Sequence, residues 1–357
     1  MKIHIPEVKR QATLVVLMLG LSACGVLDPL PPSSGEAPLL VVLKETRLTR
    51  HDADVYSVSW AHTGDSLVYS RQSSIETRPT AARSIIDPII DPKFINLWIS
   101  KRDGTQARRL TSGRFNDYDA ALDPAEREIV FFSDRSKNLD VWKMSRDGSE
   151  PRQLTTDPAS DVHPSWSPDG SRIAFISNRS GEWAIWLMTA GGQNQEQMTW
   201  GGNGDWSTTW SPDGEHIAFA STRITEENRD QLPLSQKGEE PYENFDPECV
   251  RPKLYSHIWT VDVKTKAVKQ LTRGRVHDWR PSWSPDGRHI AFVSDRDGSC
   301  ALWVMDHTGN NLHRLTRGTP FLYDGFPAWH PHKQEMAFIS NREGTFDIWL
   351  LKLKPTR

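Results

Sequence analysis

Five aspartates occupy one fixed place in a repeated stretch of the sequence, five residues before a position that is usually tryptophan. In the first repeat this place holds Val55, with Asp54 adjacent. If the repeats close into a ring, the carboxylates encircle a channel, and such a ring attracts a hydrated cation such as calcium or a basic peptide segment. These residues are Asp117, Asp161, Asp205, Asp278 and Asp324.

An arginine recurs 18 residues after each aspartate. Periodic charges usually serve the repeat itself, so the interpretation we favour is local Asp–Arg pairing that ties the units together. We therefore predict no bound cofactor, and a channel cation remains the alternative. The arginines are Arg135, Arg179, Arg223, Arg296 and Arg342.

Residues outside the periodic positions are better candidates for binding. Aromatic side chains with a few charges suit a groove for a peptide or a sugar. To the five aspartates we add Tyr118, His163, Trp206, Trp279 and His277 as predicted channel-mouth residues. Further aromatic and histidine residues expected nearby are His51, Phe115, Trp200, Phe321 and Tyr323.

Motifs for catalysis are absent from the sequence. It contains no Gly-x-Ser-x-Gly elbow, no His-Glu-x-x-His helix and no P-loop. Gly64-Asp65-Ser66-Leu67 matches an esterase motif, but it falls in a hairpin turn without a strand-to-helix context. We predict no catalytic and no metal-ligating residues, and a metal-assisted oligosaccharide lyase using His51, His163, His277 and the ring of aspartates is the enzymatic alternative.

A Leu-Thr or Met-Thr pair marks each repeat, and the interval between pairs is 44 residues in three cases. Two longer intervals of 62 and 73 residues place insertions at 73–94 and 224–256. Eleven of the fifteen tryptophans follow the same period, which makes them core residues first. The pairs begin at Leu48, Leu110, Leu154, Met198, Leu271 and Leu315.

Each repeat carries four short strand signals bounded by turn residues such as Ser167-Pro168-Asp169-Gly170. Six such units predict an all-β fold, a six-bladed β-propeller. The last unit stops after its third strand at 348–351, and the opening segment 41–49 supplies a Leu-Thr strand. One strand from the front and three from the back therefore complete the sixth blade and close the ring.

The repeat motif resembles that of TolB-type propellers, also called WD40-like or PD40 repeats. It stands as Asp161 to Gly170, Ile173 to Arg179 and Ile185-Trp186, with Gln153-Leu154-Thr155 and Gln270-Leu271-Thr272 as closing strands. The resemblance covers about 310 residues. An α/β domain precedes the propeller in that family, and we expect no counterpart of it between Cys24 and the first repeat.

The N-terminus resembles a bacterial lipoprotein signal. Basic residues precede a short apolar run, 12–19, and Leu21-Ser22-Ala23-Cys24 is similar to a lipobox, which implies lipidation of Cys24. We expect a signal peptide over 1–23, a Pro-rich linker over 24–38 and the propeller over 39–357. Export permits a disulfide between Cys249 and Cys300, which lie in equivalent connections of neighbouring units.

The formal net charge of −3 argues against a nucleic-acid partner. The sequence therefore predicts a non-enzymatic propeller, lipid-anchored at the periplasmic or extracytoplasmic face of a cell-envelope membrane. We expect it to bind a protein or peptide partner of the envelope, with carbohydrate binding or oligosaccharide cleavage as the alternative.

Overall fold

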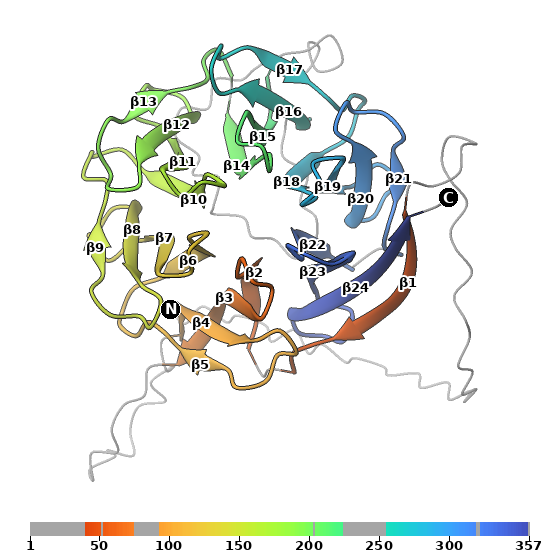
Figure 1. Cartoon of the computed structure of the whole chain (residues 1–357), viewed down its shortest axis with the longest axis horizontal. Coiled ribbons are helices and arrows are strands. Elements are labelled where there is room, and N and C mark those ends of the chain that lie inside the picture. The colour runs from red at the N-terminus through yellow and green to blue at the C-terminus, as the bar shows by residue number, and fades with distance from the viewer. Residues whose placement is uncertain are drawn as a thin grey trace, which may run out of the picture. The chain divides into compact units, whose positions relative to one another are not determined.

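Short antiparallel strands form six sheets arranged around a central axis in the computed structural model (Figure 1). The structure describes residues 40–50, 53–74, 93–202, 204–223, 255–318 and 322–355. The predicted signal peptide, linker and Cys24 lie outside these residues, as do most of the two insertions, His51, Phe321 and Cys249. The described residues contain no helix of the length and apolarity needed to cross a bilayer.

Blades one to five each consist of four strands that follow one another along the chain. Blade one comprises β2 (Val55–Trp60), β3 (Ser66–Ser74), β4 (Lys93–Lys101) and β5 (Arg108–Arg109). Blade two comprises β6 (Asp117–Leu122), β7 (Glu128–Ser133), β8 (Asp140–Ser145) and β9 (Arg152–Gln153). Blade three comprises β10 (Asp161–Trp166), β11 (Arg172–Ser177), β12 (Ala184–Thr189) and β13 (Glu196–Gln197).

Blade four comprises β14 (Asp205–Trp210), β15 (His216–Ser221), β16 (His257–Asp262) and β17 (Val268–Gln270). Blade five comprises β18 (Asp278–Trp283), β19 (His289–Ser294), β20 (Ala301–Asp306) and β21 (His313–Arg314). Blade six comprises β22 (Asp324–Trp329), β23 (Glu335–Ser340), β24 (Asp347–Pro355) and, from the N-terminal side, β1 (Leu40–Arg47).

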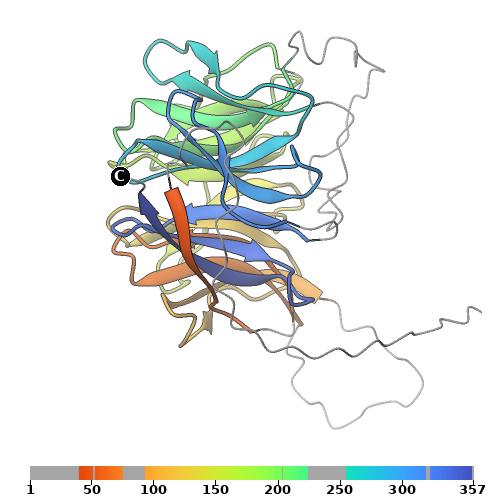
Figure 2. The same cartoon turned by 90° about the vertical axis from the view of Figure 1, so that its right-hand side faces the viewer.

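The predicted closure of the ring is confirmed. β1 pairs antiparallel with β24 from Leu40 opposite Pro355 to Arg47 opposite Trp349, and the two strands lie side by side in both views (Figures 1 and 2). A long β1 at the edge of the last blade thus joins the two ends of the propeller.

The first strand of each blade lies nearest the axis (Figure 1). Because strand direction alternates, the loop that enters the first strand and the connection from second to third strand open on one face. Both insertions belong to second-to-third connections, β3 to β4 and β15 to β16, so we call this side the insertion face. The first-to-second turns lie on the opposite face.

Phenylalanines of the second strands, or Tyr69 in blade one, fill the inside of the blades, and all six side chains are fully buried. The first tryptophan of several blades joins neighbouring blades through its indole N–H. Trp60 donates to the Ala328 carbonyl at 3.0 Å across the closure, and Trp166 donates to Ala121 at 3.2 Å. Trp210 and Trp329 make the equivalent bonds at 3.2 and 3.1 Å. The first tryptophan recurs along the sequence because it packs each of these blades against its neighbour.

Thr49, just after β1, hydrogen-bonds the start of β24 at the insertion face and so stabilises the closure. Its Oγ1 accepts the Ile348 N–H at 2.9 Å and donates to Asp347 Oδ1 at 2.9 Å, and the residue is 3 % exposed. A buried donor or acceptor that loses its partner destabilises a fold by about 1–3 kcal/mol.

We expect Thr49→Val, which keeps the shape but removes the hydroxyl, to lower the free energy of unfolding by about 1–3 kcal/mol in urea titrations. Thr105→Val is the matched control, because the Thr105 hydroxyl bonds only Asp103 in an exposed hairpin. Equal stability of the two variants would show that the closure does not depend on this threonine.

Candidate functional site: the channel at the insertion face

The five predicted aspartates begin the innermost strands β6, β10, β14, β18 and β22. Their residues are between 0 and 1 % exposed, and each carboxylate is paired with the arginine 18 residues later in the same blade. The five N–O distances lie between 2.6 and 2.9 Å. The pairing that the sequence favoured is therefore present, but it lies within blades rather than between them.

Each of these arginines is also held between two aromatic rings. In blade three, the Arg179 guanidinium lies 5.4 Å from the Phe175 ring and 4.8 Å from the Trp186 ring. The other four arginines have the same two contacts, with the phenylalanine of the second strand and the tryptophan of the third. The second set of tryptophans thus provides cation–π contacts as well as packing.

The threonine of the Leu-Thr pair makes the connection to the next blade. In blade three, Thr199 Oγ1 accepts the Ile185 N–H at 2.9 Å and donates at 2.6 Å to Asp205 of blade four. The bond from the third-strand N–H to the threonine recurs in all six blades, at 2.9 or 3.0 Å. The Leu-Thr motif therefore supplies a threonine hydroxyl that hydrogen-bonds the third strand of its blade. From the sequence alone, this motif establishes only the repeat length.

Burial raises the pKa of Asp117, Asp161 and Asp205, although the paired arginines and hydroxyl groups oppose this effect. A buried carboxylate that already has a cationic partner offers little to a ligand. The acidic ring is thus part of the scaffold, and a binding role for its members stays a prediction that the geometry does not favour. In blade one the aspartate position holds Val55, and the adjacent Asp54 accepts the Phe346 N–H at 3.0 Å.

Two residues beyond each aspartate, the innermost strand contains a β-bulge and a backbone with positive φ. A bulge changes the direction of a side chain relative to regular pleating. The φ angles lie between 47° and 59°, an unusual range for residues other than glycine. The residues are Asp119, His163, Ser207, Arg280 and Phe326.

Three of these bulge residues meet although they come from blades two, three and five. Arg280 Nη1 lies 3.1 Å from Asp119 Oδ2 and 3.4 Å from His163 Nδ1. His163 Nδ1 also hydrogen-bonds Asp119 Oδ2. The Arg280 guanidinium lies 4.0 Å from the ring of Phe326. We call Asp119, His163 and Arg280 the channel cluster, because it links opposite sides of the ring.

Contacts among Asp119, His163 and Arg280 determine the protonation states of the channel cluster. Burial alone would raise the pKa of Asp119, but Arg280 and His163 hold it well below its ordinary value. Burial and the charge of Arg280 lower the pKa of His163. Near neutral pH the cluster is therefore a carboxylate, a guanidinium and a neutral imidazole whose Nδ1–H donates to the carboxylate.

The predicted aromatic residues are distributed between the core and the surface. Tyr118 stacks on Phe132 with ring centroids 5.0 Å apart, and Trp206 and Trp279 are partly buried against core clusters. His277 is 4 % exposed, and its ring lies 5.4 Å from that of Tyr255. The channel cluster includes only His163 of the residues selected from the sequence.

Trp200 is the clearest exposed aromatic residue of the described chain, at 55 % exposure. It borders a small hollow on the insertion face together with Glu182, Trp183 and Gln197. Phe115 packs beneath Arg135 at 4.3 Å, and Tyr323 is 8 % exposed. Some of the predicted aromatic residues are thus structural, and Trp200 is available for contact.

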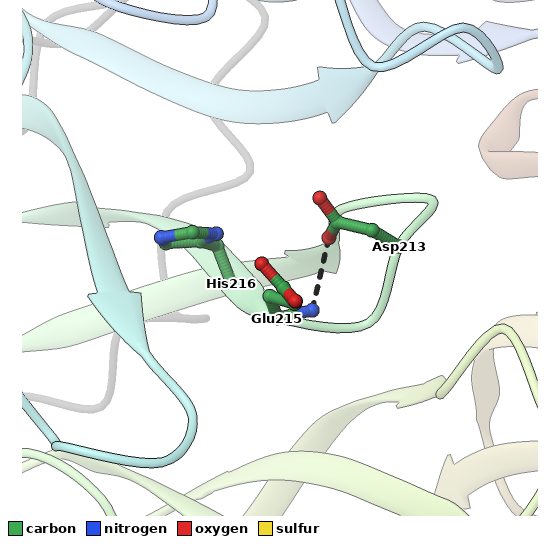
Figure 3. A group of neighbouring side chains, drawn as sticks. All are labelled: Asp213, Glu215 and His216. Atoms are coloured by element: carbon green, nitrogen blue, oxygen red, sulfur yellow. Dashed lines mark hydrogen bonds between the residues drawn. The ribbon is translucent and has the colours of Figure 1, made fainter.

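Among the described residues, one group of side chains lies close enough together to share a metal ion: Asp213, Glu215 and His216 (Figure 3). It lies at the β14–β15 turn on the face opposite the insertions. Asp213 Oδ1 already accepts from Ser211 Oγ and the Glu215 N–H, which are bonds of the turn itself. Because Asp213 and Glu215 are exposed and far from the channel cluster, we assign them no role.

Cys300 is buried and disulfide-bonded. Its predicted partner, Cys249, lies outside the described residues, so that pairing stays a prediction.

Asp119 and Arg280 should be energetically coupled although they come from opposite blades. We expect Asp119→Asn to lower the free energy of unfolding by about 1.5–3 kcal/mol, since it removes charged hydrogen bonds. In a double-mutant cycle with Arg280→Gln, the coupling should reach about 1 kcal/mol.

The measurement is urea unfolding of the two single variants and the double variant. Asp65→Asn is the control, because the Asp65 side chain is exposed in a turn. Additive effects of the two channel substitutions would contradict the contact.

Comparison with known proteins supports the repeat assignment. Residues 136–242 match the model of the Tricorn protease N-terminal β-propeller domain, and residues 251–356 match that of the TolB β-propeller domain. A 62-residue stretch, 17 % of this chain, is 42 % identical to the uncharacterized peptidase YuxL of Bacillus subtilis. That stretch spans 9 % of the relative's length.

Two solved structures illustrate the fold. The putative TolB from Agrobacterium tumefaciens has a TM-score of 0.59 and 17 % identity, covering 89 % of this chain and 97 % of that one. An oligogalacturonate lyase in complex with manganese has a TM-score of 0.50 and 15 % identity, covering 92 % and 96 %. Proteins similar to this one thus include a peptidase, a lyase and TolB proteins, and the chain contains a β-propeller whose residues 251–356 match the TolB β-propeller domain.

Proposed function

We propose that this protein is a binding module, and that it uses the channel mouth on the insertion face to bind a peptide segment of another cell-envelope protein. One observation carries the proposal: the periodic charges are paired and buried, and chemically different side chains occupy equivalent bulges around the channel. Because the bulge positions share one backbone geometry but have different side chains, they can recognise one particular ligand.

The channel cluster supports this use in a second way. Arg280 extends from blade five to Asp119 of blade two, so side chains cross the channel near its insertion-face end. A ligand that enters from this face meets a floor of fixed donors and acceptors rather than an open pore. Preorganised polar groups beneath an accessible mouth favour a defined ligand over non-specific adsorption.

The enzymatic alternative is a carbohydrate-active propeller. The Asp119–His163 pair beside Arg280 is the observation in its favour, since a histidine oriented by a carboxylate is a common general base. Among the described residues, however, no group of metal-ligating side chains lies at the channel. A metal-assisted lyase therefore has less support than a binding module.

Crosslinking in intact cells tests the binding function. A photo-reactive amino acid replaces Ser112, which is exposed in the loop that enters β6 on the insertion face. The control position is Lys264, which is exposed in the β16–β17 turn on the opposite face. We expect one discrete protein adduct from position 112 and none from position 264, with the crosslink mapped to a single peptide segment.

The same adduct from both positions, or no protein adduct from position 112, would contradict the proposal. Release of shortened oligosaccharides by the purified protein would instead favour the enzymatic alternative.

We also propose that a lipid on Cys24 tethers the propeller to a membrane, on the basis of the lipobox-like sequence before it. Covalent lipid holds a protein at a surface without a spanning helix. Cells that express Cys24→Ala should incorporate no labelled palmitate into the protein, whereas Cys300→Ala should still be labelled. Labelling of Cys24→Ala equal to that of the unchanged protein would refute the tether.

A further inference from the structure

Exposed arginines collect in the loops that lead into the innermost strands on the insertion face. They occur in the loops that enter blades one, two, five and six, whereas the loops into blades three and four contain no arginine. We call them the entry arginines: Arg50, Arg114, Arg273, Arg275 and Arg317.

Several entry arginines keep an unneutralised charge. Arg50, Arg114 and Arg275 form no hydrogen bond or ion pair with any other described residue. This distinguishes them from the scaffold arginines, each of which is paired with a buried aspartate. The described entry loops thus give the channel mouth a positive character, although the whole chain has a formal charge of −3.

Two of these arginines lie on opposite sides of the channel. Arg114 stands three residues before β6 begins, and Arg275 stands three residues before β18 begins. These are the innermost strands of blades two and five, which also supply Asp119 and Arg280 of the channel cluster. Positive charges therefore border the two sides of the mouth above the contact that crosses it.

Arg280 adds hydrogen-bond donors at the floor. Its side chain is 22 % exposed, and its contacts with Asp119 and His163 both use Nη1. Packing on Phe326 at 4.0 Å fixes the plane of the guanidinium. Nε and Nη2 form no hydrogen bond with the described residues, and a planar fork of this kind suits a carboxylate.

We propose that the channel mouth recognises an acidic peptide segment, with aspartate or glutamate side chains held by Arg50, Arg114 and Arg275 and one carboxylate at Arg280. This inference rests on the proposed function and specifies its ligand. It also replaces the expected preference for a basic peptide, because the carboxylates that would attract one are neutralised. Exposed arginines without a counter-charge, as Arg50, Arg114 and Arg275 are, steer anionic partners toward the surface that they border.

Asp119 favours a peptide over an acidic polysaccharide. Its carboxylate lies 3.1 Å from the Arg280 guanidinium, so an acceptor stands directly beside the donors at the floor. A peptide supplies both N–H donors and carboxylates to such a pair. A polyuronate chain supplies carboxylates for Arg280 but no N–H donor for Asp119.

Peptide binding to the purified full-length protein in detergent tests the proposal. The probe is a fluorescent hexaglutamate peptide, with hexalysine as the opposite-charge probe, and the readout is fluorescence anisotropy at low and high salt. The test variant combines Arg114→Glu with Arg275→Glu. The matched control combines Arg127→Glu with Arg288→Glu, which are exposed at the other ends of the same blades and change the net charge equally.

We expect hexaglutamate to bind the unchanged protein with salt-sensitive affinity, and hexalysine not to bind. The Arg114/Arg275 variant should lose affinity by about tenfold or more, while the Arg127/Arg288 variant binds as the unchanged protein does. Equal losses in the two variants, or tighter binding of hexalysine, would overturn the proposal. Tighter binding of a six-unit oligouronate would also overturn it in favour of an acidic sugar.

Repeating the Ser112 crosslink in the Arg114/Arg275 variant separates this inference from the proposed function. Loss of the adduct supports both. An undiminished adduct leaves the peptide-binding function intact and refutes the acidic ligand.

Discussion

The buried ion pair at the start of each innermost strand is the constraint on which the insertion face depends. In five blades an aspartate with almost no exposed surface meets an arginine that lies between two aromatic rings. A charge in such a position is tolerable only when its partner and its remaining hydrogen bonds are in place. The pair therefore fixes where strand one begins and where strand two ends, and so fixes both sets of loops.

For the aspartates of blades two, three and four, the threonine of the preceding blade extends this constraint to the neighbouring blade. One hydroxyl accepts an N–H from the third strand of its own blade and donates to the aspartate of the next, as Thr199 does with Asp205. Displacement of one blade would disturb the buried charge of its neighbour. At the closure, Thr49 and Asp347 join residues that are almost 300 positions apart in the chain.

With the scaffold fixed in this way, the remaining positions can differ between blades without changing the backbone. The bulge residue is aspartate, histidine, serine, arginine and phenylalanine in successive blades, all with similar positive φ. The entry loops vary in the same manner, from Arg114 and Arg275 in two opposite blades to Trp200 at the loop into blade four. The six blades therefore share one backbone arrangement but form an asymmetric surface. Recognition of a single ligand requires such asymmetry.

The sequence predicted much of the scaffold, because each of its features recurs at a fixed spacing. The blade number, the closing strand and the Asp–Arg pairs all follow from the period. The channel cluster does not. Asp119 and Arg280 are 161 residues apart, and no spacing indicates which side chains meet across an axis.

A local signal for the channel cluster did exist, in a position two residues after each aspartate where the residue type changes from repeat to repeat. The alternating pattern of a regular strand does not predict a β-bulge, and so it does not predict that this side chain points into the channel. Sequence reasoning selected His163 there for its chemistry and missed Asp119, Arg280 and Phe326. It also placed the aspartates at the channel mouth, whereas their side chains are buried, because packing between blades sets the depth of a strand end.

The most direct test of this account is one variant, Asp205→Asn, followed by two measurements: its free energy of unfolding and its yield of the Ser112 crosslink per folded molecule. If the periodic charges are scaffold, the variant loses about 3–5 kcal/mol of stability because Arg223 is left buried without its counter-charge, and the folded fraction still captures the partner. A variant as stable as the unchanged protein that no longer captures the partner would contradict the account, because the ring of aspartates would then be the binding site itself.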